Sequence, residues 1–224
     1  MTVPDPIVKK VSATTQGRYL LRLPATEGPH PLLIGFHGYG ENADVHLRQL
    51  ERIPGIEAWL VASVQALHWF YDRTHQHVVA SWMTKLYRER AIADNLRYID
   101  RVVAEILEHH DTNGCTVYEG FSQGASMAYR AASAIRHQSD GLIVLGGDIP
   151  PELRQADSLD LPPTLIGRGV RDEWFTQKRY DADLSFLASS GVTVEPVVFD
   201  GGHEWTDEFR LAAGKLLASH IQPG

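Results

Sequence analysis

Apolar side chains are concentrated in six short runs, each of which ends in glycine, proline or polar turn residues. The runs lie within PLLIGFHGYG, AWLVASVQAL, TVYEGFSQG, GLIVLGGDIP, TLIGRGVRDE and VTVEPVVFDGG. Short apolar runs that stop at turn residues are typical of strands buried on both faces. We therefore predict six buried strands between residues 31 and 202.

Longer segments with helical periodicity separate these runs. The clearest lies between Arg90 and His110, where apolar side chains recur at steps of three and four residues: Ile92, Leu96, Ile99, Val102, Val103, Ile106 and Leu107. Alternating strands and helices predict an α/β fold with a mostly parallel sheet, helices on both faces and ligand sites at the carboxyl ends of the strands. The opening segment, KKVSATTQGRYLLRLP, alternates around Gln16-Gly17 and predicts an antiparallel hairpin at the sheet edge.

We expect one domain over residues 1–224, because no repeat or linker divides the chain. One long irregular region runs from Gln65 to Glu89 and contains four large aromatic residues: Trp69, Phe70, Tyr71 and Trp82. A loop of this length inside a compact domain is more often functional than idle, so these rings are candidates to line a substrate pocket. The length leaves no room for an inserted cap domain, and this region is therefore the expected cover of any site.

Composition narrows the function classes. The net charge of −7 is spread along the chain without a basic block, which argues against nucleic-acid partners. No run approaches the length of a membrane span, and the start, MTVPDPIVKKV, lacks the apolar core of a signal peptide. The only cysteine, Cys115, excludes an internal disulfide and fits a reducing compartment. We expect a cytoplasmic monomer or homodimer without stable membrane insertion.

The strongest chemical signal is Gly120-Phe121-Ser122-Gln123-Gly124, a Gly-x-Ser-x-Gly match between a predicted strand (116–119) and a predicted helix (125–135). In a strand-turn-helix setting the serine takes a strained turn that presents its hydroxyl above the sheet. The motif alone also arises by chance, and a plain turn fits it equally well. Its meaning therefore depends on partners elsewhere in the chain.

A serine nucleophile needs a histidine base and a carboxylate that orients the histidine. Asp172 and His203 follow Ser122 in the chain order of such triads, each after a predicted strand, so all three are expected at one edge of the sheet. The backbone N–H groups of Tyr39 and Gln123 are candidates for the oxyanion hole. A purely structural glycine turn remains the alternative for the loop around Tyr39.

Four motifs together resemble the phospholipase/carboxylesterase family of α/β-hydrolases: GFSQG, HGYGEN, GVRDEW and GGHEW. The family includes small carboxylesterases and acyl-protein thioesterases, and the resemblance spans the chain from about residue 32 to the final helix. It implies Ser122 as nucleophile, His203 as base and Asp172 as orienting acid, with Tyr39 and Gln123 supplying the oxyanion hole. It also implies a small-molecule ester substrate, cleaved through an acyl-enzyme without a cofactor.

The chain departs from the family pattern at two places. It reads Ser81-Trp82-Met83-Thr84 where Trp-Phe-Asp is common, and Asp172 is followed by Glu-Trp-Phe where Val-Pro is frequent. Both departures bear on substrate choice. We expect a short to medium acyl pocket closed by Trp82, while an acyl-thioester or a lysophospholipid remains an alternative substrate. A non-catalytic ligand-binding protein of the same fold is a remoter alternative, since such proteins usually lack a triad member.

Other patterns carry less weight. The segment from Gly38 to Ala43 matches Gly-x-Gly-x-x-Ala, but no acidic residue ends the next strand to bind a ribose, so a dinucleotide is not expected. His75 and His77 lack a third ligand at useful spacing, so no metal is expected. We expect His37 to brace the loop that contains Tyr39. Asp148 is interpreted either as a substrate contact or as a turn residue.

Overall fold

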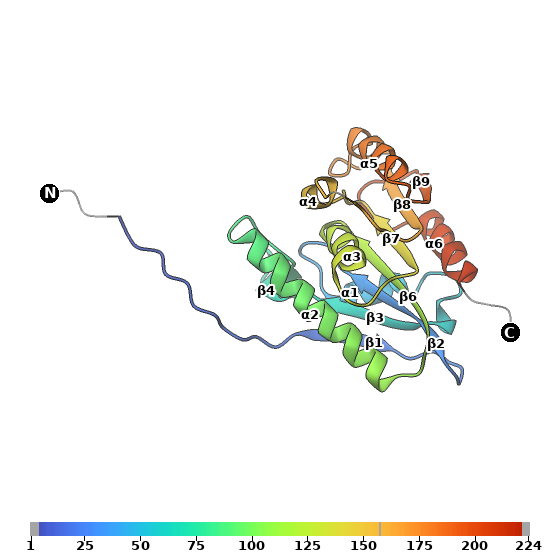
Figure 1. Ribbon diagram of the computed structural model, residues 1–224, viewed down its shortest axis with the longest axis horizontal. Coiled ribbons are helices and arrows are strands. Elements are labelled where there is room, and N and C mark those ends of the chain that lie inside the picture. Colours follow the sequence, from blue (N-terminus) through green and yellow to red (C-terminus); the bar gives the residue numbers. More distant parts are fainter. Residues whose placement is uncertain (1–4, 157, 221–224) are drawn as a thin grey trace.

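We describe the computed structural model over residues 5–156 and 158–220 (Figure 1). Its main sheet has seven strands in the order β1-β3-β2-β6-β7-β8-β9, and only β1 runs antiparallel to its neighbour. The strands are β1 (Arg18–Arg22), β2 (His30–Phe36), β3 (Leu60–Gln65), β6 (Thr112–Phe121), β7 (Gly141–Leu145), β8 (Thr164–Gly169) and β9 (Val194–Phe199). The predicted mostly parallel sheet is confirmed, and all six predicted strands form. Five of them are buried, but β9 is a partly exposed edge strand, so its predicted burial is wrong.

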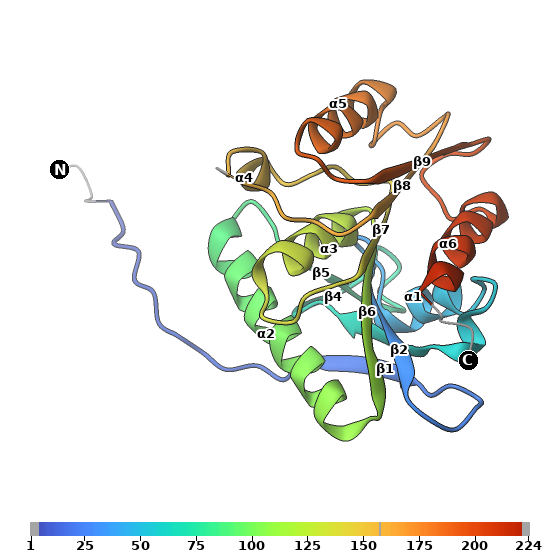
Figure 2. The same cartoon turned by 45° about the vertical axis from the view of Figure 1, so that its right-hand side comes forward.

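Helices cover both faces of this sheet (Figure 2). They are α1 (Ala43–Leu50), the short 3-10 helix η1 (Ile56–Ala58), α2 (Arg88–His109), α3 (Gln123–Ala134), α4 (Pro151–Arg154), α5 (Gln177–Ser189) and α6 (Asp207–Ser219). Side chains of α2, α3 and α5 share one core cluster, and those of α1 and α6 share the other. Along β2, Leu32 and Ile34 enter the first cluster and Leu33 the second, because successive strand side chains point to opposite faces.

The predicted N-terminal hairpin is wrong. Residues 5–17 contain no regular secondary structure, and β1 alone forms the edge strand, paired with β3. A two-residue turn at Gln16-Gly17 needs a positive φ, which Gly17 does not adopt. The position of a Cβ on Gly17 lies 2.1 Å from the ring of Tyr98, so the residue is small because α2 packs against it.

The region from Gln65 to Glu89 is less irregular than predicted. It contains a second, two-stranded antiparallel sheet formed by β4 (His68–Tyr71) and β5 (Val78–Ser81). Ala80 of β5 bridges to the HGYGEN loop (residues 37–42): it donates to the Glu41 carbonyl (2.7 Å) and accepts from Gly40 (3.0 Å). In the part of the chain described here, no helix is long and apolar enough to cross a membrane.

Candidate active site

Ser122 sits on a sharp turn between β6 and α3. Its backbone has φ 55° and ψ −116°, a conformation that side-chain-bearing residues rarely adopt. The flanking glycines make the turn possible, since a Cβ on Gly120 would lie 2.3 Å from the Gly124 carbonyl oxygen and one on Gly124 would lie 1.8 Å from that of Phe36. The Ser122 N–H donates to the carbonyl of Leu145 on the neighbouring strand (2.8 Å). The turn is thus the strained elbow that the motif predicted.

The structure brings Ser122, His203 and Asp172 into one hydrogen-bonded chain. The Ser122 Oγ lies 2.8 Å from His203 Nε2, and His203 Nδ1 lies 2.8 Å from Asp172 Oδ2. With a proton on Nδ1, the histidine donates to the carboxylate and accepts from the serine hydroxyl. The Asp172 side chain is almost wholly buried and the His203 ring is partly exposed, so the open end of the chain faces solvent.

Asp172 is held for this contact by its own loop. Its second oxygen, Oδ1, accepts from the N–H groups of Trp174 and Phe175, each at 2.8 Å. The other acids close to it in sequence are engaged elsewhere: Asp183 is buried against Arg154 and the N–H of Ile149, and Asp200 pairs with Arg171. The carboxylate that reaches His203 is therefore the one expected from the sequence.

The HGYGEN loop follows β2 and lies beside the elbow, because Gly124 lets the start of α3 approach the end of β2. Within the loop the N–H of Gly38 donates to Glu41 Oε2 (2.8 Å), and the N–H of Gly40 donates to β5. The N–H groups of Tyr39 and Gln123 donate to no acceptor among the described residues. An oxyanion hole needs N–H donors of this kind, which have no acceptor within the protein, close to the nucleophile.

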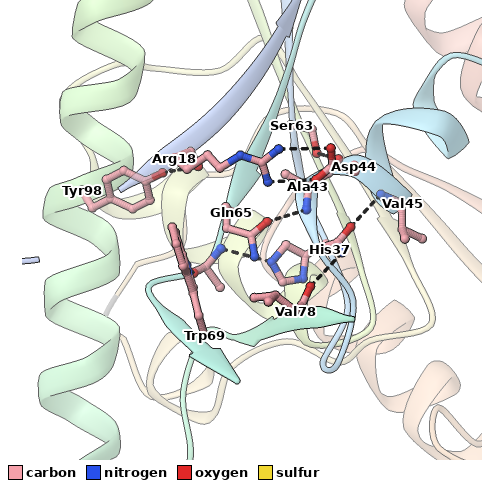
Figure 3. A network of polar contacts seen from close by, with 12 residues as sticks. Arg18, His37, Ala43, Asp44, Val45, Ser63, Gln65, Trp69, Val78 and Tyr98 are labelled. Atoms are coloured by element: carbon pink, nitrogen blue, oxygen red, sulfur yellow. Dashed lines mark hydrogen bonds and ion pairs between the residues drawn. The ribbon is translucent and has the colours of Figure 1, made fainter. Parts of the chain in front are cut away.

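His37 braces this loop, as expected (Figure 3). Its Nε2 accepts from the N–H of Ala66 (3.1 Å), so its proton lies on Nδ1 and is donated to the Gly38 carbonyl (2.7 Å). Burial lowers the pKa of His37 to about 4, so the ring is neutral at physiological pH. The ring therefore acts as a fixed spacer between β3 and the loop.

Trp82 does not line an open pocket. It is wholly buried, packs edge-on against Phe36, and donates its indole N–H to the His37 carbonyl (2.8 Å). Its own carbonyl accepts from Asn95 of α2 (2.7 Å). We predicted that Trp82 closes an acyl pocket. The ring instead packs in the hydrophobic core, so this prediction is wrong. Trp82 supports the HGYGEN loop through its hydrogen bond to the His37 carbonyl.

The other three aromatic candidates lie on β4 and are partly exposed. Phe70 contacts the exposed ring of Tyr39, with ring centroids 5.6 Å apart, so it lies next to the HGYGEN loop. Trp69 donates its indole N–H to the carbonyl of Ala66 (2.7 Å; Figure 3). Tyr71 lies beside His75. Of the three, Phe70 has a direct contact to the predicted site.

Asp148 forms an ion pair with Arg179 at 3.4 Å, and both side chains are about half exposed. Gln65 stands at the end of β3, where a dinucleotide site needs an acid, and accepts from the N–H of Ala43 at the start of α1 (2.7 Å; Figure 3). The Gln65 side chain thus caps the start of α1.

Sequence analysis missed several supporting side chains. Gln123 accepts from the Trp82 N–H (2.9 Å) and donates to the Met83 carbonyl (2.9 Å), which fastens the elbow to the segment after β5. Glu41 holds Gly38, as described above. The sequence signal for both is their place in the GFSQG and HGYGEN motifs, where only the backbone groups were predicted to have a role.

A buried acid and a buried histidine form a further pair below the elbow. Glu119 of β6 and His46 of α1 are both wholly inaccessible, and Glu119 Oε2 lies 2.7 Å from His46 Nε2. Burial raises the pKa of Glu119 well above its ordinary value and lowers that of His46 to about 4. Both shifts favour the uncharged forms, in which the Glu119 carboxyl donates to the histidine.

The chain is similar to one protein family and to several solved structures. The sequence matches the phospholipase/carboxylesterase family over residues 24–206. Comparison with curated proteins gives no match. Similar solved structures include esterase PE8, with a TM-score of 0.75 and 18% identity over 92% of this chain and 100% of that chain. Acyl-protein thioesterase 2 from Zea mays is similar with a TM-score of 0.70 and 17% identity over 91% of this chain and 99% of that one.

A phospholipase/carboxylesterase from Dyadobacter fermentans DSM 18053 gives a TM-score of 0.68 and 18% identity, over 92% of this chain and 99% of that one. At such identities the likeness establishes the shared fold. The predicted α/β-hydrolase fold is therefore confirmed, and the described residues contain no domain inserted as a cap.

Proposed function

Because the chain belongs to the phospholipase/carboxylesterase family, we propose that it is a serine carboxylesterase that cleaves esters of short to medium acyl chains through an acyl-enzyme. Ser122 is the nucleophile, His203 the general base and Asp172 the acid that orients the histidine. One observation carries the proposal: the unbroken chain of 2.8 Å contacts from Ser122 Oγ through His203 to Asp172.

In the first half of the reaction, Ser122 Oγ attacks the substrate carbonyl carbon while its proton passes to His203 Nε2. The carbonyl oxygen becomes an oxyanion and accepts hydrogen bonds from the N–H groups of Tyr39 and Gln123. The tetrahedral intermediate then collapses, the bond to the leaving alcohol breaks, and the alcohol oxygen takes the proton from His203. The acyl group remains on Ser122.

In the second half, a water molecule attacks the acyl carbon and gives a proton to His203. Collapse of the second intermediate breaks the bond to Ser122 Oγ, which regains that proton, and the carboxylic acid leaves. Asp172 stays ionised throughout and stabilises the imidazolium that forms in each half. The burial of its carboxylate and its two backbone donors support this role.

The surrounding contacts support preorganisation of the hole. The Glu41 carboxylate accepts from the N–H of Gly38. The neutral His37 ring donates to the Gly38 carbonyl, which lies in the same peptide group as the Tyr39 N–H. A donor that is already aimed at the developing charge lowers the barrier without reorganising during the reaction. We assign Glu41 as a positioning residue on this basis.

The test is a panel of p-nitrophenyl esters from acetate to palmitate and the matching acyl thioesters, assayed with wild type and Ser122→Ala. We expect turnover of the short esters by wild type and a loss of turnover in the variant, whose circular dichroism stays unchanged. Preference for palmitoyl esters, lysophospholipids or thioesters would move the substrate assignment and leave the triad in place. Full activity of Ser122→Ala would overturn the triad itself.

A further inference from the structure

An extended arm precedes the fold. Residues 5–17 leave the body without regular secondary structure and run past α2 (Figure 1). Ile7, Val8 and Val11 are exposed over 80%, 71% and 91% of their surface. Residues 7–15 are nevertheless rich in valine, isoleucine and threonine, which favour strands. The arm therefore has the composition of a strand and no strand to pair with.

The arm leads directly into a free sheet edge. β1 pairs only with β3, so its other side has no strand partner among the described residues. Beside this edge a groove of about 670 Å³ separates the end of the arm from α2, with Tyr19, Arg97 and Arg101 among its lining residues. Unpaired strand edges invite pairing with another chain. The molecule thus carries an extended arm with a strand-like composition and a sheet edge without a partner strand.

The arm cannot fold back onto its own β1 without undoing the packing at their junction. The Tyr98 ring lies against Gly17, and the Tyr98 hydroxyl donates to the Arg18 carbonyl (2.6 Å; Figure 3). Gly17 also lacks the positive φ of a tight turn. An arm from a second molecule needs no turn at this point, so the backbone conformation of Gly17 does not restrict it.

We propose that two copies of this chain exchange their arms, each arm adding a strand to the free edge of β1 in the other copy. The arms and β1 strands then form an antiparallel ribbon about a two-fold axis near Gln16-Gly17. Exchange of an identical element is a low-cost route to a dimer, since the symmetry repeats every contact twice. The ribbon places Val11 of each arm opposite the end of β1 in the other copy.

The arm is long enough for this role. Thirteen extended residues reach about 40 Å, which exceeds the length of the five-residue β1 strand. Stable dimers commonly bury about 1,600 Å² in total, and two arms of this length laid on a second molecule can supply an area of that order. The arm joins β1 at the edge of the sheet that also carries the active-site loops, since Arg18 pairs with Gln65 at the end of β3. Two strands, β3 and β2, separate β1 from β6 and its elbow, so each subunit keeps its own site.

The experiment measures molar mass by light scattering across a micromolar concentration series. Full-length protein is expected at twice the 25.0 kDa chain mass. Deletion of residues 1–14, and separately Val11→Asp, are expected to give monomers with unchanged turnover per subunit. The matched control is Leu211→Asp, an exposed apolar residue on α6 that should leave the dimer intact.

A full-length monomer at every concentration would overturn the proposal, and so would a dimer that survives the deletion or Val11→Asp. Should the deletion prevent folding, the point variant still decides the matter, because it leaves the chain length unchanged. Loss of esterase activity in every protein, including wild type, would refute the proposed function and leave the mass measurement valid.

Discussion

Replacing Glu119 by glutamine should stabilise the protein at neutral pH. The Glu119 carboxyl is wholly buried against His46, and burial raises its pKa well above the ordinary value. An unfolded glutamate is ionised at pH 7, so folding must bind a proton. A glutamine side chain at this position has nearly the same size, donates the same hydrogen bond to His46 Nε2, and needs no proton.

The size of the expected stabilisation follows from the linkage between proton binding and folding. Protonating a carboxyl with an unfolded pKa of about 4.3 costs about 1.4 kcal/mol for each pH unit above that value, or at most about 4 kcal/mol at pH 7. Structural relaxation reduces this ceiling, and we expect the free energy of unfolding to rise by about 1 to 3 kcal/mol in Glu119→Gln.

Glu119 and His46 make the stability of the protein change in opposite directions as the pH rises. The raised pKa of Glu119 means that the native state holds more protons than the unfolded state above pH about 4.3, so wild-type stability falls as the pH rises. His46, with its pKa lowered to about 4, makes stability fall as the pH drops from about 6.5. The two slopes oppose each other between these values, and only the Glu119 slope remains above pH about 6.5.

The assay is urea unfolding of both proteins from pH 5 to pH 8, with Glu108→Gln, an exposed glutamate of α2, as the control. The difference between variant and wild type should grow with pH up to the pKa of the buried carboxyl, since all other groups titrate alike. A variant that is less stable than wild type at pH 7, with a constant difference across this range, would refute the reasoning.

Three further predictions concern the site and its support. Asp172→Asn should lower kcat about 10⁴-fold, because the amide favours the wrong tautomer of His203. Asp183→Asn should lower the folding stability and leave the kcat of the folded protein nearly unchanged. If steady-state kinetics rank the two variants the other way, the orienting acid is Asp183. Glu41→Ala should lower kcat about 10- to 100-fold at nearly constant KM, and Glu41→Gln, which keeps an acceptor for the Gly38 N–H, should restore most of it. Trp82→Ala should cost about 3 to 5 kcal/mol of stability in urea unfolding, as a buried core residue, and a shift of the acyl-length optimum without such a loss would restore the pocket interpretation.

The strands and the order of Ser122, Asp172 and His203 could be predicted from sequence because each rests on local information. Strands buried on both faces read as continuous apolar runs, and strand ends are marked by glycine and polar residues. The same sheet edge then collects the residues that follow parallel strands. These signals need no knowledge of which helix packs where.

The errors came from residues whose meaning lies in distant contacts. Gly17 read as a turn residue, but its size is set by Tyr98, which is 81 positions later in the chain. Trp82 read as a pocket residue because a long loop surrounds it, whereas its indole is buried behind the HGYGEN loop. Tertiary packing decides both cases, and no local pattern reports it. A cytoplasmic location and a single domain over the full chain stay predictions.

The most direct test of the account is labelling with a fluorophosphonate probe, followed by mass spectrometry of the modified peptide. The probe reacts only with a serine that a neighbouring base activates, so labelling tests whether His203 activates the Ser122 hydroxyl. We predict one label per chain, located on Ser122, and none on folded Ser122→Ala. A label on another serine, or no label on folded wild type, would contradict the assignment of Ser122 as the nucleophile.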